Sequence, residues 1–140
     1  MYSDVKLTVH DDGRRKRVST GSAWEPVLGY SRAIRAGDTI AVTGTVGVEA
    51  DGSFSETLEG QSKRALRIIL ASIEALGGRA SDVVRTRIYV TEIARWQEVA
   101  RVHGEIFGSI RPATTIVEVA RLIDDKALVE IEADAIVIEG

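Results

Sequence analysis

A single stretch of helical periodicity in the middle of the chain limits most strongly what it can fold into. Between Thr57 and Leu76, apolar residues recur at spacings of three, four and seven, the repeat of a helix with one buried face: Leu58, Ala65, Leu66, Ile69, Ile73 and Leu76. Gly77-Gly78 ends the pattern, because glycine tolerates the left-handed conformation that closes many helices. A helix with one apolar face must pack on a second layer.

Strand-like segments flank this helix, and a second helix follows it. Asp11-Asp12-Gly13 closes a short N-terminal strand, and Ala36-Gly37-Asp38 forms a hairpin turn. The further predicted segments are strands Ser31–Arg35 and Thr39–Val48, helix Thr57–Leu76, strand Val83–Thr91, helix Ile93–Ile110, and strands Ala113–Leu122 and Leu128–Ile138. This order, β-β-β-α-β-α-β-β, predicts one α+β domain over residues 1–140, with two helices on one face of a mixed sheet.

Alternation within the last three strands separates two faces of that sheet. One parity is mostly apolar and is expected to face the helices: Val84, Thr86, Ile88 and Val90, then Val117 and Val119, then Val129, Ile131, Ala133 and Ala135. The other parity mixes charged, polar and apolar side chains: Arg85, Arg87 and Tyr89, then Thr114, Ile116 and Glu118, then Glu130, Glu132 and Asp134. This second face either carries solvated Arg–Glu pairs or is covered by other subunits. Because both predicted helices lie on the opposite face, we favour the interpretation that other subunits cover this face of the sheet.

Composition argues against several classes of partner and cofactor. The chain of 140 residues has 18 Lys+Arg against 21 Asp+Glu, a net charge of −3, so it has no overall attraction for nucleic-acid phosphates. It has no cysteine and only two histidines, His10 and His103, and no glycine-rich phosphate loop; we therefore expect no metal and no organic cofactor. No apolar run approaches the roughly 20 residues that span a bilayer, and no signal-peptide pattern is visible. We expect a cytoplasmic protein that does not bind membranes.

The C-terminal third carries a recognisable motif. Arg111-Pro112-Ala113-Thr114-Thr115-Ile116-Val117-Glu118-Val119-Ala120-Arg121-Leu122, followed by Val129-Glu130-Ile131-Glu132-Ala133, closely resembles the signature of the RidA/YjgF superfamily, also labelled endoribonuclease L-PSP or imine deaminase. Gly29-Tyr30-Ser31 and Val42-Thr43-Gly44 resemble two further elements of that superfamily. The resemblance covers roughly residues 15–138. It implies a chorismate-mutase-like fold assembled as a homotrimer, with a ligand cleft between each pair of neighbouring subunits.

The resemblance also implies an activity. Deaminases of this superfamily hydrolyse short-lived enamines and imines to 2-oxo acids and ammonia, and an arginine directly after the Pro-Ala of the motif holds the substrate carboxylate. In this chain that position is Thr114, which cannot form the bidentate charged contact of a guanidinium. The superfamily's helix asparagine aligns with Ala100, and His103 stands where a tyrosine is common. These departures predict a changed substrate or weak turnover of the usual ones.

Three matching positions are retained. Glu130 matches the acidic residue that positions or polarises water, and Tyr30 and Gly44 match cleft positions. We predict that Glu130 is catalytic and that Tyr30, Gly44 and Thr114 contact substrate. The alternatives are an ion pair between Glu130 and Arg85 or Arg87, interface packing for Tyr30, and a β-bulge or close backbone approach at Gly44.

Another basic group could hold the substrate carboxylate in place of the missing arginine. Arg87 shares the predicted face of Thr114 and Glu130, so it is a candidate substrate ligand, although a structural ion pair is the simpler and favoured interpretation. Arg111 and Arg121 are weaker candidates from the motif. His103 lies on the apolar side of a helix, which is typical of packing, and His10 lies in a polar turn.

The sequence thus supports three functions. The first is a divergent hydrolase of an imine, enamine or related C–N bond in a small metabolite. The second is a non-catalytic trimer that binds a small molecule in the same clefts. The third is the ribonuclease activity in the superfamily's name, which the acidic charge balance and the scarcity of aromatic residues disfavour.

Overall fold

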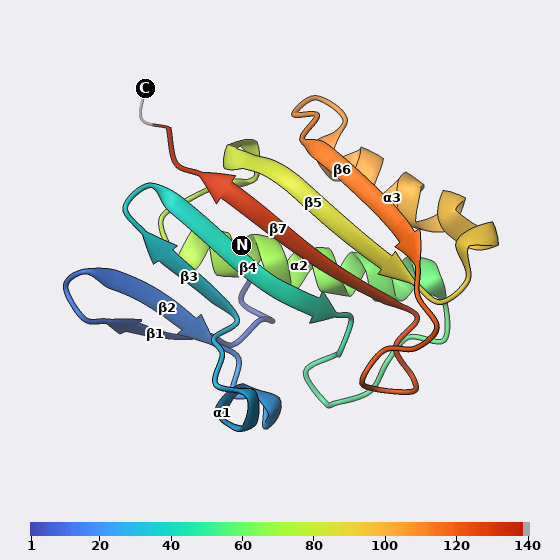
Figure 1. Cartoon of the computed structure of the whole chain (residues 1–140), viewed down its shortest axis with the longest axis horizontal. Coiled ribbons are helices and arrows are strands. Elements are labelled where there is room, and N and C mark those ends of the chain that lie inside the picture. Colours follow the sequence, from blue (N-terminus) through green and yellow to red (C-terminus); the bar gives the residue numbers. More distant parts are fainter. Residues whose placement is uncertain (139–140) are drawn as a thin grey trace.

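Seven strands form one mixed sheet in the computed structural model, which describes residues 1–138 (Figure 1). The order across the sheet is β1-β2-β3-β4-β7-β5-β6, and every neighbouring pair is antiparallel except β5 and β6. The strands are β1 Thr8–Asp11, β2 Arg15–Ser19, β3 Ala33–Ala36, β4 Thr39–Val46, β5 Val83–Val90, β6 Ala113–Glu118 and β7 Val129–Ile136. The helices are α1 Trp24–Leu28, α2 Leu58–Ala75 and α3 Trp96–Phe107, with 3-10 turns at Ala80–Asp82 and Ile93–Arg95.

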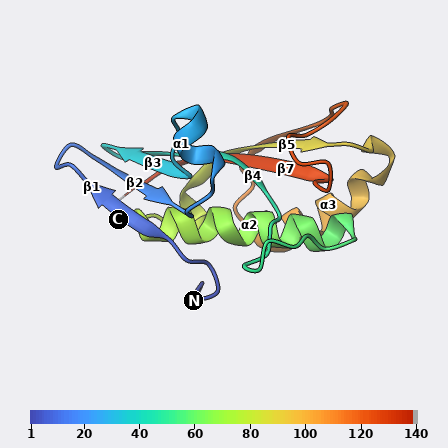
Figure 2. The same ribbon diagram turned by 90° about the horizontal axis from the view of Figure 1, so that it is seen from below.

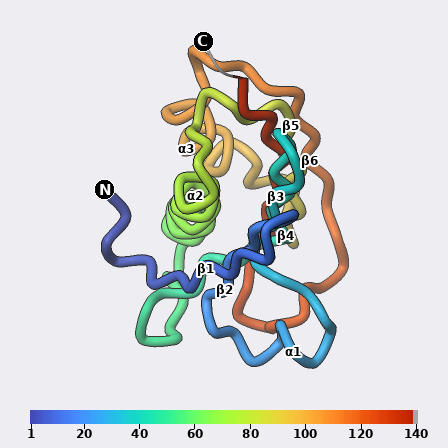
Figure 3. The backbone as a smooth tube through the Cα atoms, turned by 90° about the vertical axis from the view of Figure 1, so that its left-hand side faces the viewer, coloured from blue at the N-terminus to red at the C-terminus, as the bar shows by residue number. Residues whose placement is uncertain are grey.

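The two long helices lie on the same face of the sheet, as the sequence predicts (Figures 2 and 3). The α2 helix begins at the cap residue Thr57, whose Oγ1 accepts a hydrogen bond of 3.0 Å from the Gly60 N–H. All six apolar residues predicted for its buried face are at most 2% exposed. The short α1 helix lies on the opposite side of the sheet (Figure 2). The α+β class and the two-layer arrangement are confirmed.

The start of α2 is anchored by a buried amide. The Gln61 side chain donates through Nε2 to the carbonyl oxygens of Ser55 and Lys126, both at 2.9 Å, and its Oε1 accepts from the Leu128 N–H at 2.8 Å. The amide therefore joins the loop after β4 to the loop before β7. A Cβ at Gly47 would lie 2.2 Å from the Gln61 carbonyl oxygen, so only glycine allows β4 to approach the helix this closely.

Two elements of the structure were not predicted from the sequence. Strand β2 was not expected because its run of basic residues does not alternate, and only Val18 in it is buried. The five-residue α1 helix was also missed, because it buries only Glu25 and shows no apolar period. Trp96, the first residue of α3, is 47% exposed.

The predicted faces are correct for β7 and wrong for β6. In β7, Val129, Ile131, Ala133 and Ala135 are buried beneath the helices. In β6, Thr114, Ile116 and Glu118 lie opposite Thr86, Ile88 and Val90 in parallel register, so they share the helix side; Val117 lies on the open face and is 41% exposed. The error arose because β6 is an edge strand with no buried residue on either face. In β5, Val84 is exposed because the register with β7 shifts between Val83 and Arg85.

Within the described residues, 1–138, no helix is long and apolar enough to cross a membrane.

We expect Gly47→Ala to destabilise the protein by about 3 kcal/mol, because the methyl group would collide with the backbone of α2, which cannot move without distorting the sheet contact. The matched control is Gly104→Ala in α3, where a Cβ meets nothing within 4 Å. The control should gain about 1 kcal/mol from helix propensity. Urea unfolding of both variants measures the difference; equal stabilities would contradict the close packing at Gly47.

Candidate functional site

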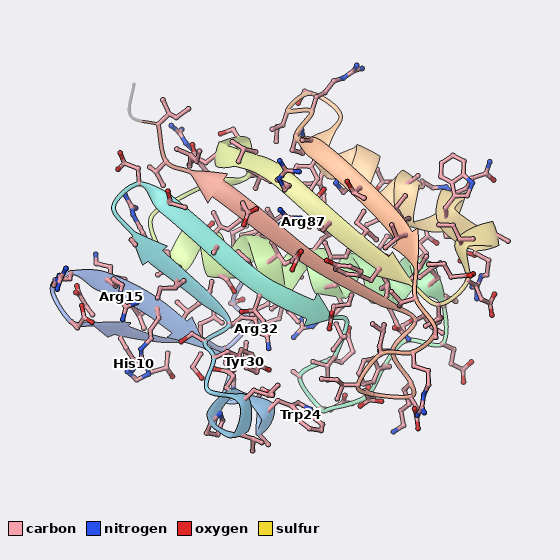
Figure 4. All side chains as sticks on the ribbon, viewed as in Figure 1. His10, Arg15, Trp24, Tyr30, Arg32 and Arg87 are labelled. Carbon is pink, nitrogen blue, oxygen red and sulfur yellow. The ribbon has the colours of Figure 1, made fainter. Side chains whose placement is uncertain are left out.

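One pocket of about 520 Å³ opens where β4 ends and β7 begins, beside α1. Its wall includes three of the predicted site residues, Tyr30, Gly44 and Glu130, together with Arg32 and Trp24. Figure 4 shows Trp24, Tyr30 and Arg32 at this end of the molecule. A second hollow, of about 380 Å³, lies against the β1–β2 hairpin and includes His10 and Arg15.

The guanidinium of Arg32 is fixed at the wall of this pocket. Its Nη1 donates to the Gly44 carbonyl oxygen at 2.8 Å and to the Thr45 hydroxyl at 3.2 Å, and its Nη2 donates to the Tyr30 hydroxyl at 3.2 Å. The group also lies over the Tyr30 ring, 5.4 Å from its centroid. Arg32 is only 8% exposed, so these contacts hold a buried positive charge in one place.

Gly44 makes room for the carboxylate of Glu130. It lies in the β-bulge where the register between β4 and β7 shifts, between Val42 and Thr45. A Cβ at Gly44 would stand 2.9 Å from both Cδ and Oε2 of Glu130. The two structural alternatives for Gly44, a bulge and a close approach, are therefore both present, and they place its backbone against the acidic side chain.

Glu130 is half-buried in the pocket. Its carboxylate has no hydrogen bond or ion pair to any of residues 1–138, so the alternative of a pair with Arg85 or Arg87 is absent from the described chain. Burial raises the pKa of Glu130, the charge of Arg32 lowers it, and the nearby Glu132 raises it; the net pKa lies above the ordinary value.

Arg87 lies on the open face, away from the pocket (Figure 4). Its Nη1 is 3.4 Å from a Glu132 oxygen and 3.2 Å from an Asp134 oxygen, so it forms the cross-strand ion pairs of the simpler interpretation. The Tyr89 hydroxyl donates to the same Glu132 oxygen at 2.9 Å. A role for Arg87 in binding substrate stays a prediction.

Thr114 and Glu130 lie on opposite faces of the sheet, so the prediction that they share a face is wrong. The Thr114 hydroxyl is 2.8 Å from the Thr86 hydroxyl, which is 2.9 Å from Nε2 of His103. Burial lowers the pKa of His103, and its ring packs against Phe107 with centroids 4.6 Å apart. His103 therefore packs on the helix side, outside the pocket.

Sequence reasoning missed Arg32. A signal was present, because Arg32 stands two residues after Tyr30, and in an extended chain such residues point to the same side. Trp24 was also missed, since α1 was not expected. No group of three or more metal-ligating side chains comes together in the part of the chain that the structure describes.

Comparison with known proteins shows the family to which the chain belongs. Residues 20–137 match the family model described as Endoribonuclease L-PSP. An uncharacterized protein of Streptomyces coelicolor is 36% identical over 121 residues, covering 86% of this chain and 90% of its own. The chain belongs to the Endoribonuclease L-PSP family, within the RidA/YjgF superfamily.

Two further matches bear on the named activity and on the fold of the superfamily. The 2-iminobutanoate/2-iminopropanoate deaminase of Dermatophagoides farinae is 30% identical over 125 residues, 88% of this chain and 97% of that protein. The crystal structure of a YjgF/YER057c/UK114 family member from Mycobacterium tuberculosis is 49% identical, with a TM-score of 0.82 over 88% of this chain and 99% of that one. Some RidA/YjgF members are thus named as imine deaminases. The fold of this chain is that of the family member from Mycobacterium tuberculosis.

We expect Glu130→Gln to stabilise the protein at pH 7. The pKa of Glu130 is raised in the folded state, so folding favours the protonated carboxyl, and the ionised form costs stability as pH rises through the folded pKa. A neutral amide removes that cost. The gain should disappear below about pH 4, where the wild-type group is protonated folded and unfolded. Urea unfolding across this pH range measures it, with Glu56→Gln, at an exposed carboxylate, as control. A gain that persists at low pH would contradict burial of the ionised carboxylate as its cause.

Proposed function

We propose that the chain hydrolyses the C=N bond of a small imine, or of the imine formed from an enamine, with Glu130 as the base that activates water. The observation that carries the proposal is a half-buried carboxylate, unpaired within residues 1–138, in a pocket of about 520 Å³ beside a fixed guanidinium. Membership of a superfamily with named imine deaminases supports the same chemistry.

The reaction has two steps. Glu130 takes a proton from water as the water oxygen bonds to the imine carbon, and the electron pair of the C=N π bond moves to nitrogen, which takes up a proton. The hydroxyl proton of the resulting carbinolamine then passes through Glu130 to the amino nitrogen as the C–N bond breaks, so that the nitrogen leaves as ammonia and a carbonyl compound remains. A base with a raised pKa is suited to the first step, because it takes up the proton of water more strongly than an ordinary carboxylate.

We also propose that the working form is a homotrimer with clefts between subunits. In one chain, Thr114 faces the helix side and Glu130 the open side, so a cleft that contains both needs two subunits. The open face supports an assembly, because no long helix covers it and it carries the half-exposed Val117 on β6 (Figure 2). Tyr30, Gly44 and Glu130 would come from one subunit, and Thr114 from its neighbour.

A second candidate function is small-molecule binding without turnover. Thr114 favours it, because the superfamily's clamp arginine is missing at that position. Both functions use the same pocket, so activity alone separates them.

The protein should accelerate release of 2-oxo acid from 2-iminopropanoate or 2-iminobutanoate generated in situ. Glu130→Gln should lower this rate by a factor of about 100 or more, the usual contribution of a general base. The control Glu56→Gln changes an exposed carboxylate outside the pocket and should keep the wild-type rate. A folded wild-type protein that gives no acceleration for either imine would leave binding as the better function.

Val117→Asp should dissociate the assembly, because the new carboxylate would be buried without a partner at the proposed interface. The control is Ile93→Asp, which places the same charge at a residue 37% exposed in the 3-10 turn before α3. Sedimentation equilibrium should give three times the chain mass for the wild type and the control, and a lower mass for the variant. A wild-type monomer at micromolar concentration would overturn the homotrimer.

A further inference from the structure

We propose that Arg32 binds the carboxylate of the substrate, and so replaces the arginine that the superfamily motif lacks at Thr114. The inference deepens the proposed function, on which it rests for the chemistry of the substrate. It identifies the ligand as a small 2-imino or 2-oxo carboxylate, and it places both the anion site and the base in the same chain.

The guanidinium of Arg32 has N–H donors that form no hydrogen bond within residues 1–138. Of its five N–H groups, three are used by Gly44, Thr45 and Tyr30. The Nε–H and one Nη2–H have no acceptor among residues 1–138. Because the three existing contacts already fix the group, binding an anion costs little side-chain entropy.

The charge of Arg32 also lacks a direct partner. No carboxylate oxygen within the described chain lies within 4.0 Å of its nitrogens. Glu25 is close enough for Arg32 to lower its pKa, but its Oε2 already accepts from the Thr20 N–H at 3.1 Å and from the Thr20 hydroxyl at 2.9 Å. A cation that is 92% buried without a contacting anion is expensive, and a bound carboxylate supplies that anion.

The neighbouring groups define what the anion must be attached to. Arg32 donates to the carbonyl oxygen of Gly44, and a Cβ on the same glycine would lie 2.9 Å from Cδ and Oε2 of Glu130. The anion site and the base therefore both adjoin Gly44. A substrate that reaches both must carry its reactive carbon next to its carboxylate. A 2-imino acid meets this condition, whereas a substrate whose reactive carbon lies several bonds from the carboxylate does not.

Arg87 is a poorer clamp on the same criteria. It lies outside the pocket wall, it is more exposed than Arg32, and it is already paired with two carboxylates. A ligand anion would have to compete with Glu132 and Asp134 for its donors.

Binding of pyruvate, a stable 2-oxo acid, tests the proposal without requiring turnover. Titration calorimetry should show that the wild type binds pyruvate and binds pyruvamide, its uncharged counterpart, at least tenfold more weakly. Arg32→Gln should weaken pyruvate binding about ten- to a hundredfold, the effect of losing a charged hydrogen-bond partner. Arg32→Lys should lie between the two, because it keeps the charge and loses the planar fork. Arg101→Gln, at an exposed arginine of α3 paired with Glu59, is the neutral control.

A readout on the wild type keeps the test decisive if Arg32→Gln does not fold. Pyruvate should shift the Nε–H resonance of Arg32 in a ¹⁵N-labelled protein, and pyruvamide should not. Unchanged Arg32 resonances at saturating pyruvate would overturn the proposal. So would pyruvate binding that survives in a folded Arg32→Gln variant, or that is lost in Arg87→Gln instead.

The outcome is distinguishable from that of the proposed function. If pyruvate binding depends on Arg32 and no imine is hydrolysed, the clamp stands and the hydrolase proposal fails. If imines are hydrolysed and folded Arg32→Gln keeps both the KM and the pyruvate affinity of the wild type, the hydrolase stands and the clamp fails.

Discussion

The packing of α2 on one face of the sheet is the constraint on which the rest of the structure depends. The helix buries its apolar residues against β4 and β7, so the side chains on the other side of these strands are free of that core. Glu130, Glu132 and Asp134 occupy this freed parity on β7. The same anchoring, through Gln61 and Gly47, sets the loops that surround the end of β4. The pocket is thus a consequence of where the helix layer ends and the open face begins.

At that boundary the local electrostatics differ from those of the open face. Along β5 and β7, Arg87 is compensated directly by Glu132 and Asp134. In the pocket, Arg32 is buried and Glu130 is half-buried, and neither contacts a counter-charge of the described chain. Buried charges kept apart in this way reduce stability, and proteins commonly retain such arrangements where binding or chemistry needs them. This contrast distinguishes the pocket from the rest of the sheet.

The elements with one clearly buried and one clearly exposed face were predictable from the sequence. The elements without such a difference between their faces were not. The α2 helix and the β3–β4 hairpin were found because apolar period and turn residues agree. The faces of β6 were assigned wrongly because an edge strand buries neither parity. Glu130 and Gly44 were identified through the resemblance, and their contact needed the fold. Arg32 was missed because it lies outside the motif that contains Thr114, and its proposed role depends on a β-bulge that brings Gly44 to its guanidinium.

The central claim is that one chain presents an anion site at Arg32 and a base at Glu130 to the same small substrate. A crystal structure of the protein with pyruvate bound tests this claim most directly. We expect the pyruvate carboxylate within hydrogen-bond distance of Arg32, with its carbonyl carbon facing the Glu130 side of the pocket. A carboxylate held instead at Thr114, at Arg87 or at the β1–β2 hairpin, with Arg32 untouched, would contradict it.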